Sequence, residues 1–230
     1  EFERDSCGFG LIAQMDGVAS HWLVRTAIDS LACLTHRGAI AADGKSGDGC
    51  GLLFKKPHEF LSAVAAEHGW ALAPLYGVGM VFLSQDMDLA VSARARVETE
   101  LRHQGLDPVG WRVVPVDPAT CGDEALRSLP RIEQIFVNGP PSGMDEVLFE
   151  RRLFMARRRA EKSLAGIDST FYFPSLSASV ISYKGLMMPA ALPLFYPDLH
   201  DPRFASALCV YHQRFSTNTW PQWRLAQPFR

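Results

Sequence analysis

The sequence predicts a layered α/β or α+β sandwich, in which helices cover sheets. Short apolar segments of strand type alternate along the 230 residues with longer segments whose apolar residues recur at helical spacing. Several strand segments follow one another without an intervening helix, which favours neighbouring strands over a bundle of helices. A chain of this length can bury a full core.

The expected elements follow from apolar periodicity and from residues that begin or end helices. Ser20 is a suitable N-cap for a helix, Gly38 suits a left-handed turn after it, and Gly105 ends a later helix. The first strand follows Cys7 and is expected to be buried because it is almost wholly apolar. We expect strands at 9–13, 52–54, 76–83, 111–116, 131–137, 171–173, 176–183 and 205–213, and helices at 20–35, 57–68, 86–104 and 144–164.

The helix expected at 144–164 carries two kinds of side chain. Val147 and Phe154, like Leu148 and Met155, are seven residues apart and form one apolar stripe. Arginines on the same helix form a basic face that either docks an acidic partner or is simply solvated, and solvation is the usual case. These arginines are residues 151, 152, 157, 158 and 159.

Composition and charge exclude several classes of protein. The net charge of -2 gives no reason to expect nucleic acid or an anionic membrane as partner. No apolar segment approaches the roughly 20 residues of a membrane helix, and the charged start is unlike a signal peptide. The five cysteines are odd in number and lack C-x-x-C spacing, so neither a metal site nor a disulfide framework is indicated. A reducing, cytoplasmic setting fits best.

Cys7 is a candidate nucleophile at the start of a strand. Gly8 and Gly10 flank Phe9, and because glycine has no Cβ the backbone beside the sulfur can bend and admit a substrate. A thiol on a rigid element suits nucleophilic catalysis. A single cysteine is also frequently a buried packing residue, so this signal alone is weak.

Two arginines in polar surroundings are candidate ligands for a carboxylate. Arg37 follows a helix and precedes a glycine-rich loop at 41–51, and Arg214 follows a strand within a segment rich in hydroxyls and amides. Such a set suits an amino acid, because a guanidinium grips its carboxylate in bidentate fashion. A surface salt bridge is the ordinary alternative for either arginine. A phosphate-binding role for the loop is weaker, because no Walker or G-x-G-x-x-G pattern is present.

Several ordered motifs resemble the glutaminase domains of glutamate synthases, which are class-II glutamine amidotransferases of the N-terminal nucleophile hydrolase group. The resemblance covers residues 1 to about 60 and 171–230, and between them it depends on length and strand order. The motifs are Cys7-Gly8-Phe9-Gly10, His36-Arg37-Gly38-Ala39, Ala42-Asp43, Gly47-Asp48-Gly49-Cys50-Gly51, residues 192–199, the run from His212 to Thr219, and residues 220–230.

The resemblance implies a fold and a site. The fold would be α+β, a four-layer αββα sandwich, and the substrate L-glutamine. Cys7 would be the nucleophile and its own α-amine the base, since an amine pKa near about 8 and a thiol pKa near about 8.5 allow proton exchange at neutrality. Arg37 would orient the amine end of the site, Arg214 would bind the glutamine α-carboxylate, and Thr217 would assist. Release of ammonia and hydrolysis of a γ-glutamyl thioester would complete the reaction.

The same resemblance sets expectations about the rest of the protein. Residues 1–6 match the end of a leader, although Glu1-Phe2 could be a cloning remnant, and while Ser6 stays bonded to Cys7 the base is missing. Residues 7–230 would form the amidotransferase domain without its C-terminal part, and the oxyanion-hole residues would lie beyond Arg230. The domain itself would need no cofactor or metal. In the full-length enzyme, ammonia would pass to a synthase domain with FMN, an iron-sulfur cluster and 2-oxoglutarate, and a small electron-transfer subunit is a possible partner.

Two alternatives remain open at this stage. One is another class-II glutamine amidotransferase with a different ammonia acceptor. The other is a catalytically silent glutamine-binding or regulatory module that keeps the fold. Labelling of Cys7 by a glutamine-like electrophile distinguishes a silent module from an enzyme.

Overall fold

The computed structural model describes residues 7–141, 143–214 and 221–229. The chain divides into two compact units, of which unit 1 comprises residues 1–60, 115–129 and 182–230 and unit 2 comprises residues 61–114 and 130–181. Two four-stranded sheets are present among the described residues. The pairs with recorded register are all antiparallel, so the protein is of mixed α and β structure as the sequence predicts.

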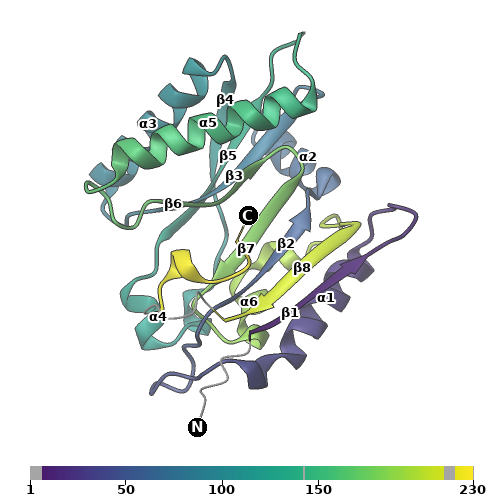
Figure 1. Ribbon diagram of the computed structural model, residues 1–230, viewed down its shortest axis with the longest axis vertical. Coiled ribbons are helices and arrows are strands. Elements are labelled where there is room, and N and C mark those ends of the chain that lie inside the picture. The colour runs from purple at the N-terminus through teal and green to yellow at the C-terminus, as the bar shows by residue number, and fades with distance from the viewer. Residues whose placement is uncertain (1–6, 142, 215–220, 230) are drawn as a thin grey trace. The chain divides into compact units, whose positions relative to one another are not determined.

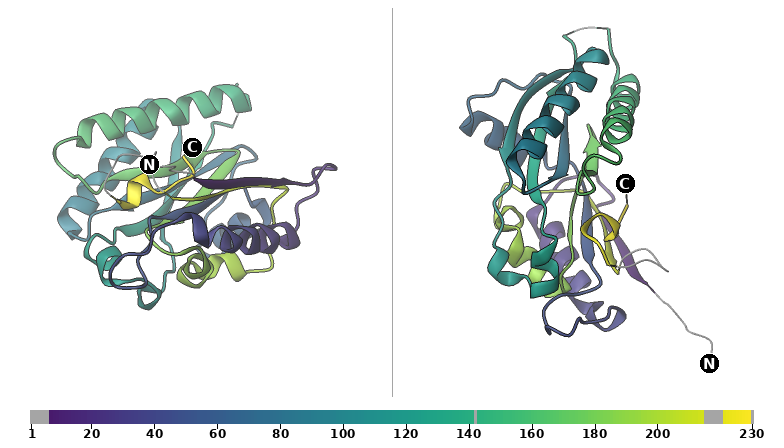
Figure 2. Two further views of the ribbon diagram at one scale, coloured as in Figure 1. Left: turned by 60° about the horizontal axis from the view of Figure 1, so that its bottom comes forward. Right: turned by 90° about the vertical axis from the view of Figure 1, so that its left-hand side faces the viewer.

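The sheet of unit 1 has the strand order β1-β8-β2-β7, which places β1 at an edge (Figure 1). Helix α1 packs against β1 and β8 (Figure 2). The strands are β1 (Gly8–Ala13), β2 (Cys50–Lys55), β7 (Val180–Gly185) and β8 (Leu208–Gln213). The helices of unit 1 are α1 (His21–Cys33), α4 (Asp123–Arg127) and α6 (Leu192–Phe195), with 3-10 turns at Thr35–Arg37, Pro118–Thr120, Pro189–Ala191, Pro197–His200 and Trp223–Leu225.

Helix α1 confirms the predicted N-cap, but the predicted turn after it is wrong. The Ser20 hydroxyl accepts a hydrogen bond from the Leu23 backbone N–H at 3.2 Å, which satisfies an otherwise unpaired amide of the first turn. Gly38 has φ −109° and ψ 155°, an extended conformation open to any residue. Glycine is needed at position 38 for a steric reason, because a Cβ there would lie 2.1 Å from Nε2 of the buried Gln213.

Strand β1 is not the buried strand that its apolar composition predicts. Phe9 is 74% exposed and Leu11 is 61% exposed, and both lie on the same side of this edge strand. Residues alternate between faces of a strand, so the packed side carries the glycines. A Cβ on Gly10 would lie 2.3 Å from the Tyr211 ring, so the side chain of this residue of β8 covers that side of β1. The prediction failed because two of the three packed positions are glycines, and Ile12 is the one large side chain on that side.

The sheet of unit 2 has the order β4-β5-β3-β6, and helices α3 and α5 pack against it and against each other (Figure 1). Val81, Ile135 and Phe173 from the sheet share a core with Leu101 and Leu153 from these two helices. The strands are β3 (Tyr76–Leu83), β4 (Asp107–Val113), β5 (Arg131–Asn138) and β6 (Tyr172–Ser177). The helices are α3 (Met87–His103) and α5 (Glu146–Leu164), and α2 (His58–Glu67) begins before the boundary of the unit.

Most predicted elements of unit 2 are found, but the predicted bounds of β4, β6 and the following strand β7 are wrong. Strand β4 begins at Asp107 and not at 111, because it includes Pro108 and Gly110, residues that are rare inside strands. Proline is tolerated there because β4 is an edge strand with a register irregularity between these two residues. The break expected near Pro174 lies instead after Ser177, so β6 and β7 are each displaced.

The apolar stripe predicted for α5 is not its buried face. Val147 is 80% exposed, Phe154 is 50% exposed and Met155 is 38% exposed. The buried face of α5 contains alanines, and helix α3, which also buries alanines, packs closely against it. The prediction was based on the large side chains of α5 and therefore selected the wrong face. That face consists of Phe149, Leu153, Ala156, Ala160 and Leu164. The arginines of α5 are exposed or half-buried, as expected for a solvated face.

Candidate active site

Cys7 and Arg214 leave the sheet of unit 1 at the same end. Gly8 on β1 is paired with Gln213 on β8, so the residue before the first and the residue after the second both lie where this pair of strands stops. The Cys7 side chain is exposed, as access to a substrate requires. The structure therefore brings together the two ends of the chain that the sequence predicts to share a site.

Arg37 reaches the same place from the 3-10 turn that follows α1. A Cβ on Gly8 would lie 3.1 Å from the Arg37 Cγ, so the aliphatic stem of this arginine covers Gly8, next to the Cys7 backbone. Its position depends on the turn Thr35–Arg37, in which the Arg37 N–H donates to the Leu34 carbonyl at 2.8 Å. Of the four predicted site residues, Cys7, Arg37 and Arg214 are thus neighbours. Thr217 lies outside the described residues, and its role stays a prediction.

The backbone of Arg214 is unusual and is held from both sides. Its φ of 105° is the one positive value among the non-glycine residues that the structure describes. Such a conformation costs on the order of 1–3 kcal/mol and persists only where the surroundings impose it, commonly at functional sites. The Arg214 N–H donates to the Gly49 carbonyl at 2.8 Å, and the Arg214 carbonyl accepts from the Gln227 N–H at 3.1 Å.

Asp48 links the two arginine-bearing segments. Its Oδ2 accepts a hydrogen bond from the Ala39 N–H at 2.8 Å and lies 3.6 Å from the Arg214 Nε. Both side chains of this ion pair are largely shielded, with exposed fractions of 18% for Arg214 and 13% for Asp48. Asp48 therefore fixes the direction of the Arg214 guanidinium and ties it to the chain that follows Arg37. The sequence analysis quoted Asp48 in a motif but assigned it no role.

Gln213 is a buried amide in the wall of the site. It is fully buried, and neither its Oε1 nor its Nε2 has a hydrogen-bond partner among the described residues. Its strand register places it between Gly8 and Cys50, and its Nε2 points toward Gly38. A buried amide usually has a hydrogen-bond partner, so Gln213 offers one donor and one acceptor group in the wall of the site that the described residues do not use.

His212 is not placed to act as a cation. Burial lowers its pKa, the nearby Arg214 charge lowers it further, and a backbone hydrogen bond opposes them. The imidazole is therefore neutral at pH 7, and its ring stacks on Phe9 with 6.4 Å between centroids.

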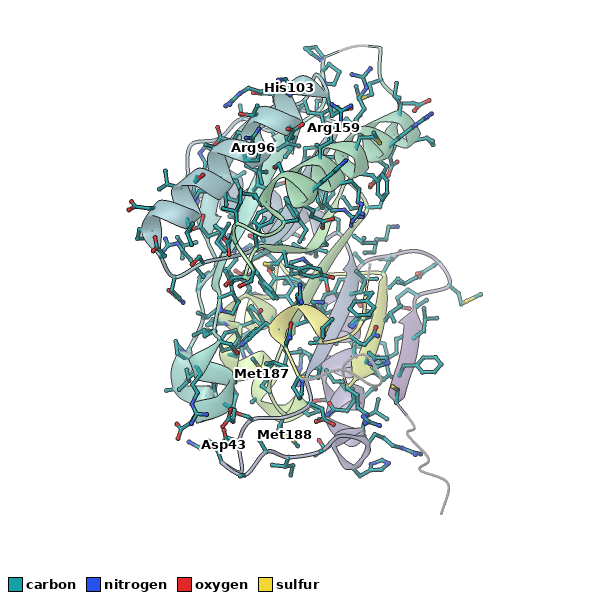
Figure 3. The ribbon with its side chains drawn as sticks, turned by 60° about the vertical axis from the view of Figure 1, so that its left-hand side comes forward. Asp43, Arg96, His103, Arg159, Met187 and Met188 are labelled. Carbon is teal, nitrogen blue, oxygen red and sulfur yellow. The ribbon has the colours of Figure 1, made fainter. Side chains whose placement is uncertain are left out.

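A loop held by one carboxylate lies beside the site. Asp43 accepts hydrogen bonds from the Ser46 hydroxyl at 2.5 Å and from the Glu124 N–H at 3.1 Å, and these bonds hold its pKa well below the ordinary value. A Cβ on Gly47 would lie 2.9 Å from both the Met187 carbonyl and the Met188 Sδ. Figure 3 shows Asp43, Met187 and Met188 gathered at this end of unit 1. The loop thus has one defined position next to Asp48.

A cavity of about 490 Å³ opens between this loop and α4. Its walls include residues 39–41, residues 46–48 and Leu186, so Asp48 borders both the cavity and Arg214. Its volume falls within the range of about 300–1,000 Å³ that small-molecule pockets have. The cavity thus adjoins the candidate site through Asp48, while Arg127 is the arginine in its wall.

The remaining cysteines differ from Cys7 in their chemistry. Burial raises the pKa of Cys50 and Cys209, and it raises that of Cys121 to about 11, so these thiols stay protonated. All five cysteines are unpaired, and no group of three or more His, Cys, Asp or Glu side chains within the described ranges is placed to hold a metal ion. In that part of the chain no helix is long and apolar enough to cross a membrane.

The comparisons with known proteins decide the family. The family described as "Glutamine amidotransferases class-II" matches residues 7–230, and the match begins at Cys7. The chain belongs to this family. The resemblance found in the sequence motifs is therefore confirmed at the level of the family.

Relatives of this amidotransferase chain are large synthases. It is 44% identical to the glutamate synthase (NADPH) large chain of Azospirillum brasilense, over 100% of this chain and 15% of the relative. It is 40% identical to ferredoxin-dependent glutamate synthase 1, chloroplastic/mitochondrial, of Arabidopsis thaliana, over 99% of this chain and 14% of the relative. The Bacillus subtilis glutamate synthase (NADPH) large chain is 39% identical over 100% of this chain and 15% of its own length. The chain thus spans about a seventh of the length of these relatives.

Three residues in or near the candidate site received no role in the sequence analysis. Asp48 and Gln213 lie inside motifs that the sequence analysis quoted, but position in a motif does not reveal a contact. Lys184 on β7 is 1% exposed, and the signal that could have found it is a lysine at an otherwise apolar strand position. Its contacts carry the inference drawn below.

Proposed function

We propose that the chain is the glutaminase part of a glutamate synthase and that it hydrolyses L-glutamine to glutamate and ammonia. One observation carries the proposal: an exposed cysteine, at which the family match begins, stands at the end of a sheet, with Arg37 over the adjacent Gly8 and Arg214 after the paired strand. A thiol nucleophile beside guanidinium groups is the set that amide hydrolysis on an amino acid needs.

The reaction begins with Cys7 as the first residue of the working enzyme. Removal of residues 1–6, a leader in this proposal, frees the α-amine, which takes the thiol proton while Sγ bonds to the glutamine amide carbon. The amine returns that proton to the leaving nitrogen, and the carbon–nitrogen bond breaks to release ammonia. Water then cleaves the γ-glutamyl thioester, which regenerates the thiol and gives glutamate.

Each of the other proposed residues acts on binding. Arg214 holds the glutamine α-carboxylate through charge-assisted hydrogen bonds, with its guanidinium directed by Asp48 at 3.6 Å. Arg37 orients the amine end of the site from its place over Gly8. Thr217 assists Arg214. The bound glutamine thereby presents its side-chain amide to Cys7, and this positioning converts a bimolecular attack into a unimolecular one.

The synthase part of the proposal concerns residues outside this chain. Ammonia passes to a synthase domain of the same polypeptide, which makes glutamate from 2-oxoglutarate with FMN and an iron-sulfur cluster. A small electron-transfer subunit is a further partner in this proposal. An iron-sulfur cluster requires several neighbouring thiolates, whereas Cys50, Cys121 and Cys209 are buried with raised pKa values and no such group exists among the described residues. The present residues do not fit the cluster, and no proposed step involves it.

We also propose the four-layer αββα arrangement for the fold. In unit 1 helix α1 packs on the sheet, and in unit 2 helices α3 and α5 pack on the other sheet, so each unit supplies one helical layer and one sheet layer. Two such units stacked through their sheets would make four layers. The cytoplasm is the proposed compartment, because the five cysteines are unpaired.

Ammonia release from glutamine tests the glutaminase proposal. The full-length enzyme with Cys7 as its first residue should release ammonia, whereas Cys7→Ala and a form that retains Ser6 should not. Formation of a second glutamate that depends on 2-oxoglutarate distinguishes a glutamate synthase from an amidotransferase with another acceptor. Binding of glutamine without hydrolysis would indicate a silent module and would refute the proposal.

A further inference from the structure

Lys184 carries a buried amino group that holds a segment near the end of the described chain. It is 1% exposed on β7, and its Nζ donates to the Ala226 carbonyl at 2.7 Å and to the Arg224 carbonyl at 2.9 Å. The Phe229 ring covers the same group, with 5.1 Å between Nζ and the ring centroid. A buried ammonium is costly unless its donors are used, and here backbone carbonyls use them. Burial lowers its pKa to about 7.

The segment that Lys184 holds, residues 224–227, fits the sheet closely. A Cβ on Gly51 would lie 2.6 Å from both the Gln227 carbonyl oxygen and the Lys184 Cβ. A Cβ on Gly49 would lie 2.9 Å from the Ala226 Cβ. Strand β2 and the residue before it thus admit segment 224–227 only because they present glycine at these two positions.

Segment 224–227 is in turn bonded to Arg214. The Gln227 N–H donates to the Arg214 carbonyl at 3.1 Å, while the Gly49 carbonyl accepts from the Arg214 N–H at 2.8 Å. These two bonds hold Arg214 at φ 105°, a conformation it would not keep by itself. A continuous set of contacts therefore runs from the Lys184 ammonium through segment 224–227 to the Arg214 backbone.

We propose that Lys184 is a positioning residue for glutamine binding: it fixes segment 224–227, which holds the Arg214 backbone so that the guanidinium faces the substrate carboxylate. The inference rests on the proposed function, because it assumes that Arg214 binds glutamine. The two Nζ hydrogen bonds of Lys184 go to backbone carbonyls of segment 224–227, so its effect on Arg214 passes through that segment. Its loss should therefore weaken substrate binding and leave the reactivity of the thiol intact.

Kinetics of the full-length enzyme test the proposal with Lys184→Met, which keeps the length of the side chain and removes its donors. The KM for glutamine should rise about tenfold with kcat changed by less than about threefold. Alkylation of Cys7 by iodoacetamide, which needs no arginine, should keep its rate. Lys162→Met on the exposed face of α5 is the matched control and should leave KM unchanged. Lys184→Arg should retain most of the affinity, because a guanidinium can still donate to both carbonyls.

A double-mutant cycle separates positioning from a general loss of structure. In an Arg214→Met background, Lys184→Met should cause little further fall in kcat/KM, since both changes remove the same interaction. Gly51→Ala keeps the Lys184 amino group but crowds both the Gln227 carbonyl and the Lys184 Cβ, so it should displace segment 224–227 and raise KM alike, which provides a second variant if Lys184→Met fails to fold. If Lys184→Met leaves KM unchanged, or if its effect on kcat/KM is fully additive to that of Arg214→Met, the inference is overturned and the proposed function is not affected. Wild-type enzyme without glutaminase activity would overturn the proposed function and the inference with it.

Discussion

Gly38→Ala should damage the site through one steric contact. The added Cβ would lie 2.1 Å from the Nε2 of Gln213, far closer than atoms in van der Waals contact. Gln213 is fully buried and lies between Gly8 and Cys50, so its amide must find room for the shift among packed neighbours. Gly38 itself needs no special backbone conformation, since its φ is −109°. The cost is therefore purely one of space.

Overpacking of this kind costs typically about 1–3 kcal/mol. For a domain of this size, each kcal/mol lowers the melting midpoint by about 2–4 °C. Because Arg37 precedes Gly38 directly, kcat/KM for glutamine should fall as well. The assay is thermal inactivation of glutaminase activity in the full-length enzyme, with kcat/KM measured on the same samples.

Truncation of the opposing side chain provides the control. Gln213→Ala removes the atom that the new Cβ would meet, so the Gly38→Ala/Gln213→Ala double variant should be more stable than the sum of the single effects predicts. The Gln213 amide has no hydrogen-bond partner among the described residues, and its removal forfeits no bond recorded there. A Gly38→Ala enzyme that inactivates at the wild-type temperature, or strictly additive single effects, would refute the reasoning.

Three further predictions concern thiol reactivity, binding and pH. Iodoacetamide at pH 8 should label the exposed Cys7 and Cys33 but not the three buried thiols, because burial raises the pKa of those thiols. Peptide mass spectrometry identifies the labelled residues, and labelling of Cys50 at a similar rate would contradict its buried position. Arg214→Met should lower kcat/KM for glutamine by about 10–150-fold, the equivalent of a charged hydrogen bond of about 1.5–3 kcal/mol, whereas a change in kcat alone would exclude a binding role. Burial lowers the Lys184 pKa to about 7, so between pH 7 and 10 the unfolded chain binds more protons than the folded one. The free energy of unfolding of the wild type, relative to that of Lys184→Met, should therefore rise by up to about 1.4 kcal/mol per pH unit. If the two enzymes differ in thermal inactivation temperature by the same amount at pH 7 and at pH 9, the buried position of Lys184 is contradicted.

The sequence predicted the elements better than their faces. The bounds of β3 and the cap of α1 agree with the structure, because uninterrupted apolar runs and a capping hydroxyl are local signals. The exposed Phe9 and the alanine face of α5 were missed, because which side of an element is covered depends on neighbours distant in the sequence. Gly38 shows the same limit, since its glycine is required by Gln213, 175 positions later.

Only part of the site could be predicted, because some of its contacts join residues that are distant in the sequence. Residue type and motif order identified Cys7, Arg37 and Arg214, and the fold brings them to one end of a sheet. The contacts of Asp48 and Lys184 depend on backbone groups, which no pattern of side chains in the sequence reveals. Supporting residues of a site are therefore found only once the backbone is in place.

Covalent capture of the nucleophile tests the central claim most directly. The mature full-length enzyme is treated with a diazo-ketone analogue of glutamine, and the N-terminal peptide is then sequenced by mass spectrometry. The account predicts one label, on the sulfur of Cys7, in a peptide whose first residue is Cys7, with protection by glutamine. A fully active enzyme that carries the label on another residue, or keeps Ser6 bonded to Cys7, would contradict it.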